Sequence, residues 1–140
     1  MRYLRKIFAH SKVRSASLLI IAGLVLASLV SYSSSDPSFN LVTDNSPSNF
    51  LLYFGSYLSD ILFQFIGLAA YIIPLCAIVW SYLLFRDGEL SLSFLRTLSM
   101  FVSIGFACAG LNLVVIGYLP AGTGGIVGIS VWYFSKEYLN

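Results

Sequence analysis

Ile61–Phe85, ILFQFIGLAAYIIPLCAIVWSYLLF, is a stretch without a single charged residue. As one helix it would be about 37 Å long, enough to cross the ~30 Å hydrocarbon core of a bilayer with some tilt. A soluble domain could bury such a helix only inside a large core, which the rest of the sequence does not supply. We therefore predict an all-α integral membrane protein. Pro74 removes a backbone hydrogen bond within this run, so a kink is expected there.

The composition of the whole chain also favours a membrane protein. Of its 140 residues, 58% are hydrophobic and only 10% are charged, whereas soluble domains average about 25% charged residues. The net charge of +2 hides an asymmetry, because Arg2, Arg5, Lys6, Lys12 and Arg14 all lie near the N-terminus. We predict that residues 1–14 form a basic cytoplasmic tail beside anionic lipid headgroups.

Two further apolar runs complete the predicted spans. Ser15–Tyr32 follows the basic tail. A signal peptide has the same order of features, but this run is long for its apolar region and lacks an A-x-A-like cleavage site. Thr97–Tyr118 follows a short loop bounded by Arg86 and Arg96, which the positive-inside rule places in the cytoplasm. The chain is thus predicted to cross three times, near 15–32, 61–85 and 97–118, with the N-terminus in and the C-terminus out.

The two remaining segments are predicted to lie outside. The first, after Tyr32, is rich in serine, asparagine and proline and has acidic residues but no lysine or arginine. The second, 119–128, reads LPAGTGGIVG. No Lys-Ser/Thr follows its glycines and their spacing misses the dinucleotide fingerprint, so we interpret it as a tight turn. It closes a multi-helix membrane domain at 15–128, and the aromatic-rich residues 129–140 then form an outer interfacial segment.

Residues that carry chemistry in enzymes are sparse. Cys76 and Cys108 fall within predicted spans without metal-ligand spacing, so they are expected to pack as small apolar residues. His10 has no nucleophile or carboxylate constellation around it. We predict no catalytic, cofactor-binding or metal-binding residue, and no enzymatic activity. Small residues at helical spacing in the third span predict a face for close contact with the second span: Ser99, Ser103, Ala107 and Gly110 or Leu111.

Three segments, taken in order, resemble the N-terminal membrane domain of the FtsK/SpoIIIE family of DNA translocases. Ser31–Phe39 is similar to the family's S-Y-x-x-x-D-P-S-aromatic segment, Gly55–Pro74 to its second span, and Leu119–Gly128 to its L-P-x-G-x-G-G-x-x-G outer turn. The positions that we single out from these matches are Asp36, Pro37, Asp60, Gly67, Pro74, Pro120, Gly122, Gly124, Gly125 and Gly128.

The resemblance implies a bundle of usually four helices that anchors an ATP-driven, hexameric DNA motor at the division septum. This sequence stops where a fourth span would begin and has neither linker nor motor, so we expect a fragment or a truncated gene product. The resemblance further implies location in the bacterial inner membrane at the septum, contacts with lipid and septal proteins, and homo-oligomers if the domain is intact. Direct binding of nucleic acid by this chain is not expected.

Two other classes of membrane protein are also compatible with the sequence. A small helical transporter or channel subunit would normally show a charge within a span, and none of the three predicted spans has one. A membrane adaptor unrelated to division fits the composition equally well and differs only in lacking the three family segments.

Overall fold

The computed structural model describes residues 2–88, 93–114 and 124–138, and within these ranges it contains helices and no strand. The all-α prediction is confirmed for this part of the chain. The elements are α1 (Arg2–Val30), α2 (Leu52–Ile66), the 3-10 helix η1 (Gly67–Tyr71), α3 (Ile72–Asp87), α4 (Ser93–Val114) and α5 (Gly125–Tyr138).

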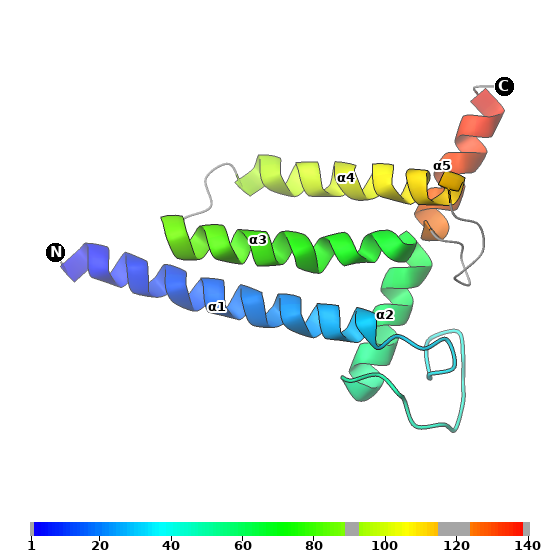
Figure 1. The fold of residues 1–140 in the computed structure, drawn as a ribbon, viewed down its shortest axis with the longest axis horizontal. Coiled ribbons are helices and arrows are strands. Elements are labelled where there is room, and N and C mark those ends of the chain that lie inside the picture. The colour runs from blue at the N-terminus through cyan, green and yellow to red at the C-terminus, as the bar shows by residue number, and fades with distance from the viewer. Residues whose placement is uncertain (1, 89–92, 115–123, 139–140) are drawn as a thin grey trace.

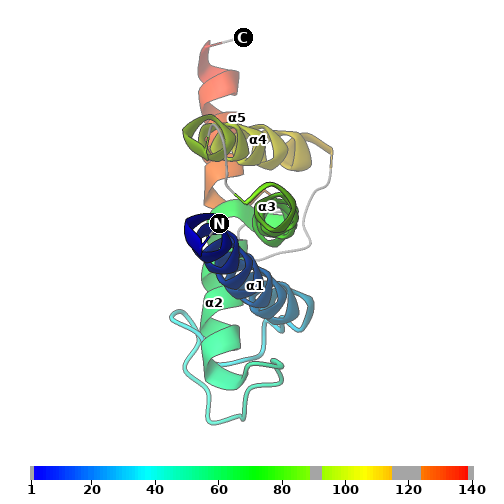
Figure 2. The same cartoon turned by 90° about the vertical axis from the view of Figure 1, so that its left-hand side faces the viewer.

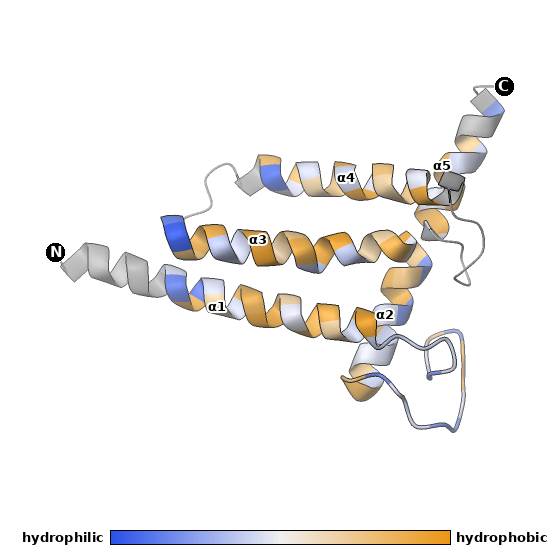
Figure 3. Cartoon of the chain, viewed as in Figure 1, coloured by the Kyte–Doolittle hydropathy of each residue, from blue (hydrophilic) through white to orange (hydrophobic). Residues whose placement is uncertain are grey.

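The three helices α1, α3 and α4 lie in a row, while α2 and α5 run across one end of that row (Figures 1 and 2). The loop 31–51 hangs at this same end, which we call the loop end. Hydrophilic residues mark the opposite end (Figure 3), which we call the charged end and define by Lys12, Arg14, Arg86, Asp87 and Arg96. The contact between α1 and α3 is more extensive than the contact between α3 and α4.

α1 extends through the predicted basic tail. The helix begins at Arg2, so residues 1–14 are not separated from the first predicted span by a change of backbone structure. The physical reason is the absence of glycine and proline from this segment, together with its lysines and arginines, which favour helix. The apolar part, Ser11–Val30, is long enough to cross a bilayer.

The predicted second span is not one helix, because the chain breaks at Gly67. This glycine has φ 58° and ψ −143°, a backbone conformation that residues other than glycine rarely adopt. The expected kink at Pro74 is therefore a wrong prediction. Pro74 lies in the first turn of α3, where its missing N–H would have no helical partner anyway. The turn at Gly67 directs α2 across the row and α3 along it (Figure 1).

The apolar surface of the helices is suited to lipid rather than to a soluble core. Two segments, Ser11–Val30 and Leu52–Asp87, are apolar and long enough to span a bilayer, and only 22% and 28% of their apolar windows are buried inside the structure. Leu95–Leu111 and Gly125–Phe134 are shorter apolar helices. Large exposed side chains occur along all three helices of the row, for example Ile20, Leu24, Leu75, Val79, Phe101 and Phe106. A protein in water rarely exposes so large an apolar surface.

Two small buried clusters hold the elements together. Leu29, Phe63 and Ala70 join α1 to α2 and η1, and Ala69, Ile104 and Cys108 join η1 to α4. The predicted contact face of the third span is only partly right. Ala107 and Leu111 pack against the second cluster, but Ser99 and Ser103 are exposed and donate their hydroxyls to carbonyls of their own helix. That internal bonding satisfies both hydroxyls without a neighbouring helix.

Candidate functional site

Buried polar residues gather at the loop end and form what we call the loop-end cluster: Ser28, Asp36, Asn49, Ser56, Ser59 and Asp60. Asp36 is its central acceptor. One carboxylate oxygen accepts hydrogen bonds from Ser48 N (3.0 Å) and Ser48 Oγ (2.8 Å), and the other from Asn49 N (3.0 Å). Hydrogen bonds to a charged group are the stronger kind, so Asp36 fixes the two ends of the loop against each other.

Asn49 connects this loop to the end of α1. Its side-chain amide donates to the carbonyls of Ser28 (2.8 Å) and Ser31 (3.3 Å), two acceptors in the last turn of the helix and just after it. Such carbonyls have no partner within the helix itself. The Ser28 hydroxyl in turn donates to the carbonyl of Gly55 in α2 at 2.8 Å. A Cβ at Gly55 would lie 1.9 Å from Asn49 Oδ1, so only glycine leaves room for this contact.

Serines of α2 hold the segment around Pro37. The Ser56 hydroxyl donates to the carbonyl of Pro37, and the Ser59 hydroxyl donates back to the Gly55 carbonyl at 2.8 Å. Pro37 itself is buried. The Asp36-Pro37 pair that the family resemblance singled out therefore fixes the loop in two directions. The Asp36 carboxylate accepts hydrogen bonds from Ser48 and Asn49 of the loop, and the Pro37 carbonyl accepts one from Ser56 of α2.

Asp60 lies one turn further along α2 and binds a different partner. Its carboxylate accepts a 2.6 Å hydrogen bond from Gln64 Nε2. Gln64 Oε1 accepts one from Asn40 Nδ2 at 2.7 Å, which ties the middle of the loop to the same face of α2. Asp36 and Asp60 thus anchor two different parts of loop 31–51.

The glycines of the second family segment and of the outer turn meet at the helix break. Gly125 begins α5 with φ +63°, and a Cβ there would lie 2.5 Å from the backbone of Phe65, so the backbones of α5 and α2 touch. The carbonyl of Ile66, the residue just before the break, accepts a 3.3 Å hydrogen bond from the Cys108 thiol. Gly67, Gly125 and Cys108 together allow three elements to converge at this point.

The structure brings some of the predicted site residues together and separates others. Asp36, Pro37 and Asp60 belong to the loop end, while Gly67, Gly124, Gly125 and Gly128 lie at or next to the crossing of α2 and α5, where the last three are buried. Pro74 is fully buried in α3. Pro120 and Gly122 lie outside the described residues.

The boundary between the predicted tight turn, 119–128, and the predicted outer interfacial segment, 129–140, is not a boundary of the backbone structure. Gly125 and Gly128 are helical, and the Gly128 N–H donates to the Gly124 carbonyl at 3.0 Å. α5 therefore begins before the predicted boundary between residues 128 and 129. Glycine content alone favoured a turn, but Gly125 provides close approach to α2 instead.

Sequence reasoning missed several residues of the loop-end cluster. Ser28, Asn49 and Ser56 occur in segments where serine and asparagine are common and carry no motif beyond the resemblance. The signal that was available is Ser28 within an otherwise apolar helix, because a polar group among apolar residues near a membrane must find a partner. Cys108 was predicted only to pack, and its hydrogen bond to the Ile66 carbonyl follows from the packing of α4 against η1, which the sequence does not reveal.

The chemistry available to this arrangement is structural. Among the described residues, no group of three or more His, Cys, Asp or Glu side chains could hold a metal ion. The hydroxyls, amides and carboxylates of the loop-end cluster are engaged with one another or with backbone. At the charged end, Arg86 donates two hydrogen bonds to the exposed Asp87. The arrangement can fix a loop and a helix crossing in one geometry.

Comparisons with known proteins agree on one family. Residues 11–140 match the family described as the 4TM region of DNA translocase FtsK/SpoIIIE. A DNA translocase FtsK from Rickettsia typhi is 38% identical over 138 residues, which cover 99% of this chain and 18% of that protein. One from Rickettsia bellii shows the same identity and coverage. One from Rhizobium meliloti is 31% identical over 139 residues, 95% of this chain and 16% of that protein. The chain thus spans less than a fifth of these relatives, and no solved structure matches it.

Proposed function

The chain belongs to the FtsK/SpoIIIE family, whose 4TM membrane region it matches over residues 11–140, and from this we propose that it is the membrane anchor of a DNA translocase that couples cell division to chromosome segregation. The single observation that carries the proposal is this match, which covers α3 and α4 completely and α1 from residue 11 onward. In this proposal the chain itself neither hydrolyses ATP nor binds DNA, and it serves to hold the translocase at the division septum of the inner membrane.

The arrangement of the helices supports three crossings. α1, α3 and α4 follow one another in alternating directions, and their lysines and arginines collect at the charged end (Figure 3). The positive-inside rule then puts the charged end in the cytoplasm and the loop end, with α2 and α5, outside. In this topology the N-terminus is inside and the C-terminus outside, and α3 replaces 61–85 as the second crossing segment.

The loop-end cluster supports a role for the outer segment in septal contacts. A loop held by two carboxylates presents the same surface to every partner, and a preorganised surface loses less conformational entropy on binding. Phe39 and Val42 are 69% and 96% exposed on this fixed loop. We propose that proteins of the division septum contact the loop through such residues.

The topology is tested with single cysteines at Ser46, Ser91 and Ser135 in a chain lacking Cys76 and Cys108. A membrane-impermeant thiol reagent applied to intact spheroplasts should label positions 46 and 135 and leave 91 unlabelled. After the membrane is opened, 91 should label as well, which shows that the site is reactive. Labelling of 91 in intact spheroplasts would overturn the proposed orientation.

The septal role is tested with a fluorescent protein on the N-terminus of the chain in dividing cells. Fluorescence should concentrate at the septum, and Asp36→Asn should disperse it around the membrane. Asp44→Asn, which changes an exposed carboxylate of the same loop, should leave it concentrated. Uniform membrane fluorescence of both the unaltered chain and its relatives' full-length proteins would favour a generic membrane adaptor instead.

A further inference from the structure

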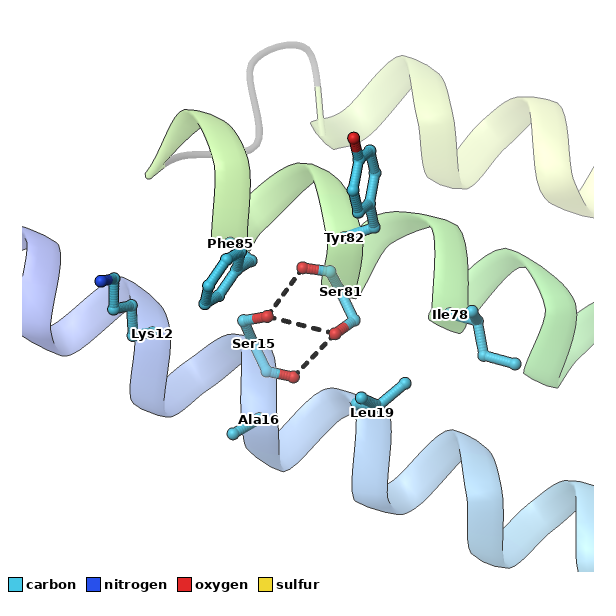
Figure 4. A pocket seen from close by; sticks show the side chains of 8 residues that line it. All are labelled: Lys12, Ser15, Ala16, Leu19, Ile78, Ser81, Tyr82 and Phe85. Carbon is cyan, nitrogen blue, oxygen red and sulfur yellow. Dashed lines mark hydrogen bonds between the residues drawn. The ribbon is translucent and has the colours of Figure 1, made fainter.

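A groove of about 470 Å³ lies between α1 and α3 toward the charged end (Figure 4). This volume falls within the range of about 300–1,000 Å³ that is typical of small-molecule sites. Its position is distinct from the loop-end cluster and from the helix crossing, and the proposed anchoring function does not require it. The groove therefore needs its own explanation.

The walls of the groove are apolar. α1 contributes Ala16 and Leu19, and α3 contributes Ile78 and Phe85. The floor between them is closed by Ser15 and Ser81, whose hydroxyls donate to each other's backbone carbonyls (Figure 4). Because these hydroxyls are already bonded, the groove offers a ligand mostly hydrocarbon contact over this part of its length.

One end of the groove is cationic. The Lys12 ammonium lies at the end of the groove, 5.5 Å from the centre of the Phe85 ring. On the other helix the Arg86 guanidinium lies 5.9 Å from the centre of the Tyr82 ring, but it is paired with Asp87 and does not line the groove, so the cation among the lining residues is Lys12. An exposed cation–π contact contributes only about 0.5–1 kcal/mol, so the ammonium of Lys12 can still bind a stronger anionic partner.

This order of groups matches an amphiphile with a negative head. In the proposed topology the charged end lies at the cytoplasmic surface, and Leu19, which is 50% exposed, lies about two helical turns deeper. A chain lying along Ala16, Leu19 and Ile78 would place its head beside Lys12. The position of the cation at the headgroup level and of the apolar walls below it fits a phospholipid in one orientation only.

We propose that this groove binds an anionic phospholipid of the cytoplasmic leaflet, with one acyl chain along the apolar walls and the phosphate at Lys12. The inference rests on the proposed orientation of the chain but not on its septal role, so septal localisation can fail while this site stands. It adds a defined lipid ligand to a domain that otherwise needs the bilayer only as a solvent.

The charge requirement is tested by native mass spectrometry of the whole chain, released from detergent and titrated with phosphatidylglycerol or with phosphatidylcholine. The unaltered chain should bind phosphatidylglycerol about fivefold more tightly, and Lys12→Gln should remove this preference. Arg14→Gln removes the same charge from an exposed residue that does not line the groove, and it should change the affinity less than twofold. Lys12→Arg should keep the preference.

The steric requirement is tested with a bulky side chain on the groove wall. Ala16→Phe should weaken the binding of both lipids, because it occupies the path of the acyl chain. Ser17→Phe introduces the same side chain at an exposed neighbour that does not line the groove, and it should leave binding unchanged. Far-UV circular dichroism of each variant should match that of the unaltered chain, and Lys12→Arg provides the charge-preserving comparison if Lys12→Gln lowers helicity.

Three results would overturn the proposal. Equal losses for Lys12→Gln and Arg14→Gln would mean diffuse attraction to the whole basic end. Displacement of phosphatidylglycerol by millimolar inorganic phosphate would mean that a free anion, not a lipid, occupies the site. If no lipid adducts form and the chain is a dimer that Ala16→Phe dissociates, the groove would instead be occupied by a second copy of the chain.

Discussion

Ser15 and Ser81 lie 66 positions apart in the chain, yet each donates its hydroxyl to the backbone carbonyl of the other. The two distances are 2.7 Å for Ser15 Oγ to Ser81 O and 2.9 Å for Ser81 Oγ to Ser15 O, and both side chains are buried. Such a reciprocal pair requires two small residues and two backbones in close approach. It fixes both the distance and the rotation of α1 relative to α3.

Replacing both serines should cost less than the sum of the two single replacements. Ser15→Ala and Ser81→Ala should each lower the free energy of unfolding in mixed micelles by about 0.6 kcal/mol, the average for hydrogen bonds between membrane helices. The double variant should show a coupling energy of similar size, because each change already breaks part of the shared arrangement. Ser17→Ala is the control, since the Ser17 hydroxyl donates only to the Val13 carbonyl of its own helix. Strict additivity would show that the pair does not act as a unit.

Removing the charge of Asp36 should loosen the outer loop. Asp36→Asn turns one acceptor oxygen into a donor that faces the N–H groups of Ser48 and Asn49, so we expect a loss of about 1–3 kcal/mol of local stability. Limited proteolysis from the outer side should then cut the loop faster, while the helices stay intact. Asp44→Asn should leave the cleavage rate unchanged, because Asp44 is exposed. A loop that is equally resistant in both variants would contradict the role given to Asp36.

Alanine should have opposite effects at two glycines of the chain. Gly125→Ala should destabilise the fold by at least about 2 kcal/mol, because its φ is +63° and the new Cβ would meet the backbone of Phe65. Gly110→Ala meets no atom within 4 Å and should stabilise α4 by about 0.5–1 kcal/mol. Unfolding of both variants in mixed micelles measures the difference directly. Equal effects would place α5 away from α2.

The contact between α4 and the helix break should be sensitive at Cys108 and insensitive at Ser103. Cys108→Leu adds volume to a fully buried position and should cost about 1–3 kcal/mol, whereas Ser103→Leu changes an exposed position and should be tolerated. Cys108→Ser keeps a donor for the Ile66 carbonyl and should lie between the two. Thermal stability in detergent distinguishes the three variants, and a greater loss for Ser103→Leu would restore the contact face expected from the sequence.

The existence of the helices could be predicted because apolar length is a property of one continuous segment. Residues 15–32 and 97–118 overlap α1 and α4 for this reason. The break was assigned to the wrong residue because Gly67 and Pro74 both disrupt helices by intrinsic propensity. Only the position relative to the helix start decides between them, and Pro74 falls in a first turn where proline is tolerated.

The candidate site was only partly accessible from the sequence. The family resemblance identified Asp36 and Asp60, but the contacts of Asp36 with Ser48 and Asn49, and of Asp60 with Asn40 through Gln64, depend on how loop 31–51 folds back onto α2. Hydrogen bonds between residues distant in sequence are set by tertiary packing and leave no periodic signal. Ser99 and Ser103 of α4 gave a wrong prediction of the contact face for a related reason. A serine can either pack at a helix–helix contact or donate its hydroxyl to a carbonyl of its own helix, and the sequence does not distinguish the two.

The glycine at position 67 also sets how much of the chain the bilayer must accommodate. The apolar segment Leu52–Asp87 contains 36 residues and, as one straight helix, would be about 54 Å long, far more than the ~30 Å hydrocarbon thickness. Such an excess would be relieved by strong tilting or by local thickening of the lipid, each at an energetic cost. Since the chain turns at Gly67, α2 lies across the row and α3 alone follows it, so in the proposed topology the second crossing helix has 16 residues and is about 24 Å long. The break at Gly67 thus replaces a large excess of apolar length by a helix slightly shorter than the hydrocarbon core, a difference that a small local thinning of the lipid accommodates.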